Sequence, residues 1–306
     1  MNAVAIDHVT KTFGTHTAVN DLSLEVPAGS IYGFIGPNGS GKTTTLRMIM
    51  RILHPDRGTI RVLGAERLGA ANDRVAYLPE ERGLYKQMKV RDVLRFYAEL
   101  KGCRNSKPSI DAWLTKLDLT DWADKKVQTL SKGMAQKVQF IATVVAKPEL
   151  VLLDEPFSGL DPVNAEVLRE AILGLRRDGA TIIFSTHDMA VAEKMCDFVF
   201  MIYQGNKVLD GTLDAIQNSY GRDTIRVELE GSPPLDGLPG VAKATNFGRV
   251  HELRLEPDAD PQRILTRLTE LGRVRHFEIA RPTLHDIFVR IAQPENRERP
   301  KDAAGA

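Results

Sequence analysis

The sequence has few of the residues that mark secreted, zinc-binding or membrane-spanning proteins. Among its 306 residues only Cys103 and Cys196 are cysteines, with no CxxC pair, so we expect neither a disulfide framework nor a structural zinc site. No uncharged apolar run approaches the about 18 residues that a membrane-spanning helix requires. Residues 1–7 lack the charged start and apolar core of a signal peptide. These absences predict a soluble protein of a reducing, cytosolic compartment.

The sequence also lacks an excess of either charge. Lys and Arg number 41 against 40 Asp and Glu, a formal net charge of +1, so no broad basic field predicts binding to nucleic acid or anionic lipid. Hydrophobic residues make up 42% and charged residues 26% of the chain, which is ordinary for a globular protein with a sizeable core. The length suits one large domain with a small one, or two comparable domains.

Hydrophobic patterning in the first half predicts a mixed α/β fold. Apolar residues alternate around positions 4–8 and 22–26, as in half-buried antiparallel strands. Residues 30–35 form a short apolar run typical of a strand buried on both faces, and a glycine-rich segment and a helical pattern over 43–53 follow it. Strand, glycine loop and helix together open a parallel α/β unit.

The rest of the chain predicts a helical insertion and then a second domain. Residues 90–146 show mostly helical spacing, whereas 151–153 and 181–184 are buried strands separated by a helix from Asp161 to about residue 177. Asp161 suits an N-cap and Pro162 the first helical position. Residues 198–203 and 207–209 predict a hairpin through 204–206.

Composition changes after residue 220. We expect a small α+β domain over 221–292, with strands near 225–229, 253–255 and 277–279 and helices near 262–271 and 283–291. The charged, Pro- and Ala-containing tail 293–306 is predicted to be disordered. The domains are therefore 1–220, with a helical subdomain at about 86–146, and 221–292.

A phosphate-binding loop follows the first buried strand. Its residues match GxxxxGK[ST] in full and are Gly36, Pro37, Asn38, Gly39, Ser40, Gly41, Lys42 and Thr43, with Thr44 next to them. Glycines let backbone N–H groups curl around a polyphosphate, and the helix N-terminus that follows adds partial positive charge. Lys42 is expected to reach the β- and γ-phosphates and Thr43 to ligate Mg²⁺.

Two carboxylates end the strand at 150–153. Asp154 is expected to hold the metal, mostly through water, and Glu155 to orient and deprotonate an attacking water. A strand that merely ends in solvated acids is the alternative, and the phosphate loop upstream argues against it. Together, the loop and the carboxylates predict a site that binds a polyphosphate with Mg²⁺ and activates a water to hydrolyse it.

With these motifs in view, the chain resembles the nucleotide-binding subunit of an ABC (ATP-binding cassette) transporter. Leu130-Ser131-Lys132-Gly133-Met134 resembles the family's LSGGQ signature, Ser158-Gly159-Leu160-Asp161 its D-loop, and Ser185-Thr186-His187-Asp188 its switch histidine. Tyr77-Leu78-Pro79-Glu80 resembles the Q-loop, and Phe13 stands where the family stacks an aromatic ring on adenine. The resemblance covers residues 1 to about 220.

The resemblance implies a functional role for each of these residues, and each residue also has a simpler structural explanation. Phe13 would stack on adenine or else pack in the core, and His187 would contact the γ-phosphate or else be a surface histidine. Ser131 and Gly133 would complete the ATP site of a second chain, with Ser131 also a helix N-cap. Asp161 would combine a cap with a contact across the dimer.

Two departures from the family pattern stand out. The signature has Lys132 and Met134 in place of glycine and glutamine, and the Q-loop has Glu80 in place of glutamine. Glu80 still offers an oxygen toward Mg²⁺, but it adds a charge and lacks an amide donor. The consequence of each departure stays open at this point.

These departures and the segment 281–288 resemble the ATPase chains of ABC-2-type exporters, which carry a small C-terminal domain. The resemblance implies a chain at the inner face of the cytoplasmic membrane that powers export through a separate integral-membrane permease. It also implies head-to-tail pairing with a second copy or a related ATPase subunit. Residues 80–95, with Leu84 and Tyr85, are the expected permease-docking surface, although core packing is an alternative for both. An importer ATPase, or a soluble ABC ATPase acting on ribosomes or DNA, are the rival functions.

Overall fold

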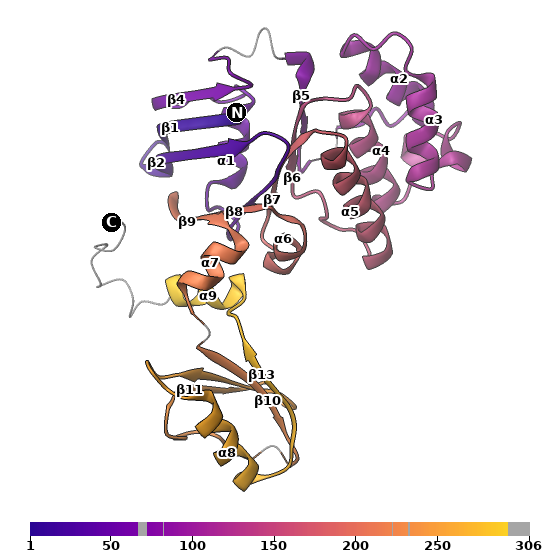
Figure 1. Cartoon of the computed structure of the whole chain (residues 1–306). Helices are drawn as coiled ribbons and strands as arrows, with labels where there is room; N and C mark the ends of the chain where they lie inside the picture. The colour runs from indigo at the N-terminus through magenta and orange to yellow at the C-terminus, as the bar shows by residue number, and fades with distance from the viewer. Residues whose placement is uncertain (67–71, 82, 222, 232, 293–306) are drawn as a thin grey trace. The chain divides into compact units, whose positions relative to one another are not determined.

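The computed structural model describes residues 1–66, 72–81, 83–221, 223–231 and 233–292 (Figure 1). These residues form two compact units, of which the first ends at Thr212 and the second begins at Leu213. The tail that we expected to be disordered, 293–306, lies outside the described residues. No helix in the described part of the chain is long and apolar enough to cross a membrane.

The division between the units falls earlier than the boundary at 220/221 that composition suggested. Helix α7 (Leu213–Ser219) belongs to the second unit. The Gln217 side-chain amide donates to the Pro282 carbonyl over 3.1 Å, and Arg281 pairs with Asp214. These bonds join α7 to the segment that precedes the last helix, and sequence periodicity does not show such a contact.

The first unit is built on a six-stranded sheet with the order β5-β6-β7-β3-β8-β9. Its strands are β3 (Ile31–Ile35), β5 (Val75–Leu78), β6 (Leu150–Asp154), β7 (Thr181–Thr186), β8 (Phe198–Tyr203) and β9 (Asn206–Thr212). All neighbours are parallel except β8 and β9, which form the expected hairpin. Its turn is Gln204-Gly205, and both residues have positive φ, as a type I′ hairpin turn requires.

A three-stranded antiparallel sheet with the order β2-β1-β4 packs against one face of this sheet. It consists of β1 (Asn2–Phe13), β2 (His16–Pro27) and β4 (Arg57–Val62). Apolar side chains from both sheets and from α1 (Lys42–Ile49) share one core. This confirms the antiparallel strands predicted from the alternation near residues 4 and 24.

Helices α4 (Lys132–Val144), α5 (Pro162–Arg177) and α6 (Met189–Met195) lie against the opposite face of the six-stranded sheet, and α2 (Val90–Leu100) and α3 (Lys107–Lys116) pack against α4 (Figure 1). Successive residues of β7 alternate between the two cores, since Ile182 and Phe184 face the helices whereas Ile183 faces the antiparallel sheet. A strand buried on both faces explains the uninterrupted apolar run in the sequence.

The second unit is a four-stranded antiparallel sheet with helices. Its sheet order is β11-β12-β10-β13, from β10 (Thr224–Leu229), β11 (Val241–Asn246), β12 (His251–Leu255) and β13 (Val274–Ala280). Helix α8 (Pro261–Leu271) places Ile264 and Leu268 in a core with Ile225 and Val227. Helix α9 (Leu284–Ala292) ends the described chain, and its Arg290 forms a bidentate pair with Asp223.

Candidate functional site

The phosphate loop, residues 36–43, leaves the carboxyl end of β3 and enters α1. Two of its glycines are required because the backbone of neighbouring strands passes close to them. A Cβ on Gly36 would lie 2.2 Å from the Ile202 carbonyl oxygen, and one on Gly41 would lie 2.5 Å from that of Ala18. Both also have positive φ, which side chains rarely adopt. The loop is therefore held tightly against β2 and β8, with its N–H groups at a helix N-terminus.

Lys42 directs its ammonium group into the loop. Its Nζ donates to the carbonyls of Gly36 (2.7 Å) and Pro37 (3.1 Å) and lies 3.9 Å from Glu155 Oε1. The side chain is only 6% exposed. Burial lowers the pKa of Lys42, while the negative charges of Glu155, Asp154 and Glu80 act in the opposite direction. A buried cation within a loop of backbone amides is suited to bind a polyphosphate.

Asp154 is the centre of a buried hydrogen-bond cluster at the carboxyl end of β6. Its Oδ1 accepts from Thr43 Oγ1 (3.0 Å) and Ser185 Oγ (2.6 Å), and its Oδ2 accepts from the Tyr77 hydroxyl (3.1 Å). Burial, together with the Asp154 charge, raises the pKa of Tyr77 to about 12. The phenol therefore stays protonated and donates at neutral pH, and these donors fix the orientation of the carboxylate.

Glu155 follows directly and faces the loop. Its carboxylate lies 3.0 Å from His187 Nδ1 and its side chain is 10% exposed, whereas that of His187 is 59% exposed. Its backbone adopts a left-handed conformation with φ of 48°. The chain thus turns sharply at the end of β6, which points this carboxylate toward the phosphate loop beside the carboxylate of Asp154.

Lys42, Thr43 and Glu155 border a cavity of about 340 Å³, whereas Asp154 and His187 are not among its lining residues. Of the predicted residues, its lining holds Phe13, Asn38, Gly39, Ser40, Gly41, Lys42, Thr43, Thr44, Glu80 and Glu155. Phe13 is 47% exposed, so its alternative role as a core residue does not apply. Glu80 reaches the cavity from the loop after β5, which Gln139 of α4 anchors by donating to the carbonyl of Glu81 over 3.2 Å.

Ser131, Gly133 and Asp161 lie together at the starts of α4 and α5. Ser131 caps α4 by accepting from the Met134 amide, and Asp161 caps α5 by accepting from Val163 and Asn164. A Cβ on Gly133 would lie 3.7 Å from the Asn164 side chain, so the two caps adjoin each other. The cavity beside the phosphate loop is lined by other residues. Both predicted caps are confirmed.

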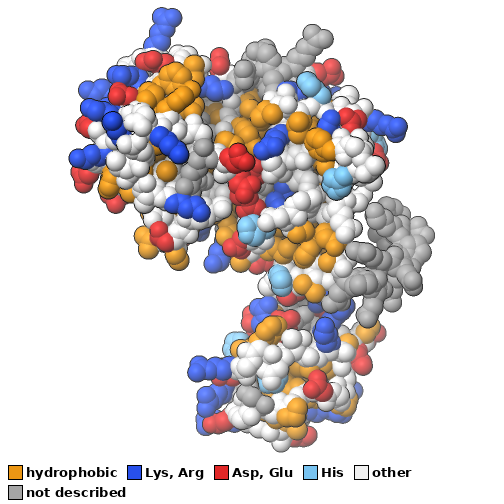
Figure 2. Space-filling view, turned by 180° about the vertical axis from the view of Figure 1, so that it is seen from behind, with side chains coloured by type: hydrophobic (Ala, Val, Ile, Leu, Met, Phe, Trp, Pro, Cys, Tyr) orange, Lys and Arg blue, Asp and Glu red, His pale blue; other side chains and the backbone are white. Residues whose placement is uncertain are grey.

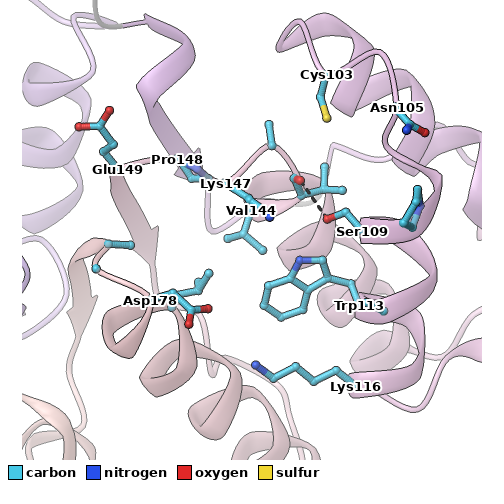
Figure 3. A pocket seen from close by; sticks show the side chains of 17 residues that line it. Cys103, Asn105, Ser109, Trp113, Lys116, Val144, Lys147, Pro148, Glu149 and Asp178 are labelled. Atoms are coloured by element: carbon cyan, nitrogen blue, oxygen red, sulfur yellow. Dashed lines mark hydrogen bonds between the residues drawn. The ribbon is translucent and has the colours of Figure 1, made fainter.

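A larger cavity of about 1030 Å³ lies at the amino ends of β6 and β7, where α3, α4 and α5 approach them (Figure 3). Trp113 forms one wall, and Lys116 extends beneath it with Nζ 4.9 Å from the ring centroid. Ser109 closes another side by donating to the Val145 carbonyl over 3.3 Å. The phosphate loop and the carboxylates lie at the opposite edge of the sheet, so this cavity takes no part in their chemistry.

Comparisons with known proteins agree with this geometry. Residues 19–158 match the family model "ABC transporter", and residues 211–292 match "ATP-binding protein DrrA1-3-like, C-terminal domain". The chain is 41% identical to "Uncharacterized ABC transporter ATP-binding protein YhaQ" of Bacillus subtilis, over 94% of this chain and 97% of that one. It belongs to the ABC transporter ATP-binding family.

Two further similarities extend the comparison to export and to a solved structure. The chain is 35% identical to "Nod factor export ATP-binding protein I" of Burkholderia lata, over 95% of this chain and 97% of that one. A solved "Structure of ATP binding subunit of ABC transporter" superposes with a TM-score of 0.67 at 30% identity, covering 72% of this chain and 93% of the other. The ABC ATPase fold and ATP binding expected from the sequence are thereby confirmed.

Three neighbours of the ABC site escaped the sequence interpretation. Ser185 and Tyr77 hold Asp154, and His16 lines the cavity beside Phe13, with which it pairs across the β1–β2 turn. Tyr77 lies in the Q-loop segment and Ser185 in the switch-histidine segment, but the family resemblance assigned a role to neither. The parallel register that sets Asp154 opposite Ser185 was the missing information.

The site also fits Mg²⁺. Mg²⁺ prefers oxygen ligands and is usually held by one or two protein oxygens together with substrate phosphates. The Thr43 hydroxyl and an Asp154 carboxylate oxygen lie 3.0 Å apart at the mouth of the phosphate loop, and Glu80 offers another carboxylate at the same cavity. Hard oxygen donors therefore converge where the phosphates of ATP would lie.

Proposed function

We propose that this ABC ATPase powers export across the cytoplasmic membrane through a separate ABC-2-type permease, from a position on the inner face of that membrane. The observation that carries the proposal is a cavity lined by Lys42, Thr43 and Glu155 in a chain whose C-terminal residues match a DrrA1-3-like domain. The similarity to a Nod factor export protein over nearly the whole of both chains supports the direction of transport. The transported substrate would be selected by the permease.

In this proposal the residues divide the work at the ATP site. The amides of residues 36–44 and the Lys42 ammonium bind the β- and γ-phosphates, and Phe13 stacks on adenine. Glu155 accepts a proton from the attacking water, while His187 holds the Glu155 carboxylate through Nδ1 and presents its other nitrogen toward the γ-phosphate. Mg²⁺, held by Thr43 and Asp154 with Glu80 nearby, would neutralise phosphate charge.

Ser131, Gly133 and Asp161 act on the ATP of a second chain. Gly133 is the second residue of α4, where a backbone N–H has no acceptor within its own helix. The Ser131 hydroxyl and this N–H thus form a donor pair for a γ-phosphate. Because one chain holds both halves of such a site, a second copy paired head to tail suffices, and a related ATPase subunit is the other candidate. Closure on ATP and opening after hydrolysis then give a two-state clamp.

The docking surface for the permease is proposed in the described part of residues 80–95. Tyr85 is 52% exposed and its ring packs edge-on against Phe96, with centroids 5.5 Å apart. Leu84 instead packs against the helical core, which favours the core role for that residue. The exposed Tyr85 ring, backed by the half-buried Phe96, offers an apolar contact on the segment that follows Glu80.

Recovery of the membrane partner tests this function. An affinity-tagged chain purified from detergent-solubilised membranes should bring with it a polytopic integral protein, identified by mass spectrometry. Tyr85→Ala should reduce this recovery several-fold, whereas Phe247→Ala, an exposed aromatic of the second unit, should leave it unchanged. ATP-driven transport that requires a surface substrate-binding protein would indicate an importer instead. Salt-dependent RNA binding would favour a soluble ABC ATPase, although Figure 2 shows Lys and Arg interspersed with acidic and apolar side chains.

A further inference from the structure

Ser185 forms hydrogen bonds with both acidic residues of the ATP site, to the side chain of Asp154 and to the backbone of Glu155, but it does not line the cavity beside the phosphate loop. It is the fifth residue of β7 and is completely buried. Parallel pairing of β6 with β7 sets Asp154 opposite Ser185. The side chain therefore points along the sheet edge where the strand that carries both acids ends.

One hydroxyl makes two bonds at this position. Ser185 Oγ donates its hydrogen to Asp154 Oδ1 over 2.6 Å and accepts from the Glu155 backbone N–H over 3.1 Å. A hydroxyl has one hydrogen and two lone pairs, so both bonds are satisfied at once. Alanine would supply neither bond, whereas threonine keeps the same donor and acceptor on a side chain that suits a strand.

The bond to Glu155 matters most because of that residue's backbone. With φ of 48°, Glu155 adopts a left-handed conformation that residues with a Cβ rarely populate. Such conformations persist where surrounding bonds hold them in place. The Ser185 hydroxyl gives the buried Glu155 amide an acceptor in this conformation, and the conformation aims the carboxylate at Lys42 and His187.

The two acids depend on Ser185 to different degrees. Asp154 also accepts from Thr43 and from Tyr77, so two donors remain if the serine hydroxyl is removed. For the Glu155 amide, the Ser185 oxygen is the acceptor that the structure shows. Loss of the hydroxyl should therefore disturb water activation by Glu155 more than nucleotide or metal binding around Asp154.

We propose that Ser185 is a positioning residue for ATP hydrolysis, whose hydroxyl holds Glu155 in its left-handed conformation while it orients Asp154. The inference rests on the proposed role of Glu155 as the base. It adds to the site a residue that acts through the backbone of its neighbour rather than by contact with ATP.

Steady-state ATPase kinetics of the full chain test the inference. Ser185→Ala should lower kcat by about 10- to 100-fold, the usual effect of losing a group that orients a reactive residue, with KM for ATP changed less than about 3-fold. Ser185→Thr should restore most of kcat. If the alanine variant does not fold, Ser185→Cys takes its place. A thiol has a similar shape but is a weaker donor and acceptor, so kcat should fall by less than the loss expected for alanine.

A matched control lies at the other end of the same strand. Thr181 is also buried, and its hydroxyl accepts from the Gly29 amide over 2.9 Å, far from the carboxyl edge of the sheet. Thr181→Val removes that bond and should leave kcat unchanged. If Ser185→Ala behaves like Thr181→Val, or if Ser185→Thr is as slow as Ser185→Ala, the inference is overturned.

Glu155→Gln, measured in parallel, separates this inference from the proposed role of Glu155. Its normal turnover would refute Glu155 as the base. Slow turnover by Glu155→Gln beside normal turnover by Ser185→Ala would refute only the positioning role. In the double variant, Ser185→Ala should lower kcat by less than about 2-fold beyond Glu155→Gln alone, because the effects of residues that act as one unit are not additive. A full additional loss of kcat would show that Ser185 does not act through Glu155.

Discussion

At the scale of single residues, the ATP site combines side chains that are almost completely buried with side chains that are about half exposed. Lys42, Asp154 and Glu155 are buried, whereas Phe13 and the His187 side chain stay half exposed. The buried groups bind charge and fix geometry, since charges interact more strongly away from water. The exposed groups lie where a ligand must enter.

Phe13 provides the residue-scale prediction. Stacking on a base contributes about 1–3 kcal/mol, so Phe13→Ala should raise KM for ATP by about 5- to 150-fold. The kcat should stay nearly unchanged because the phosphates are held elsewhere. The same rise is expected with GTP, since every base has a face to stack on. Phe13→Tyr should keep wild-type KM.

The control for this measurement is another exposed aromatic. Phe247→Ala removes a ring from the second unit that is 68% exposed and should leave KM unaltered. An unchanged KM in Phe13→Ala would show that adenine is bound by other groups.

The residues of this site differed in how far the sequence could predict them. Residues 36–43 and the pair Asp154 and Glu155 follow from local spacing, because their roles depend on one loop and one strand end. The contacts of Ser185 and Tyr77 depend on which strands are neighbours in the sheet, with 31 and 77 positions separating them from Asp154. A single sequence without relatives does not specify that register.

At the scale of elements, uniform apolar runs were the reliable signal. β3, β6 and β7 are buried along their whole length and were predicted. β4, β5 and β11 were not. β4 buries only Ile60 and Val62, β5 has four residues, and β11 is a polar strand at a sheet edge. Such strands form because neighbours pair with them rather than because of their own pattern.

The packing of α6 against β3 gives the element-scale prediction. Gly33 lies in the middle of β3, and a Cβ there would come within 2.5 Å of the Cys196 sulfur at the end of α6. The Cys196 side chain is half-buried against this strand, and burial raises the pKa of its thiol. Gly33→Ala should therefore lower the free energy of unfolding by about 1–3 kcal/mol, as overpacking does.

Removing the sulfur should relieve the clash. In a Cys196→Ala background, the new Cβ would meet its next neighbours at 3.7 and 3.8 Å, which is ordinary contact. Gly33→Ala should then cost little, and urea unfolding of the two single variants and the double variant measures this coupling. Equal costs in both backgrounds would show that the helix end shifts without strain.

At the scale of the whole molecule, the residues that we propose for the ATP site fall into two separate groups within the ATPase unit. Lys42 and Glu155 line the cavity at the phosphate loop, whereas Ser131 and Asp161 gather at the starts of α4 and α5. One chain thus has a surface that binds ATP and another that we propose completes the site of its neighbour. Pairing of two chains around ATP is the central claim of this account.

Sedimentation velocity of the Glu155→Gln chain with ATP and Mg²⁺ tests that claim most directly. The account predicts a dimer with ATP and a monomer without it, and loss of the dimer in the background of Lys42→Ala. Ser131→Asp should also prevent pairing, because aspartate keeps the helix cap but sets a negative charge against the γ-phosphate. A chain that binds ATP and stays monomeric, or a Ser131→Asp chain that still pairs, would contradict the account.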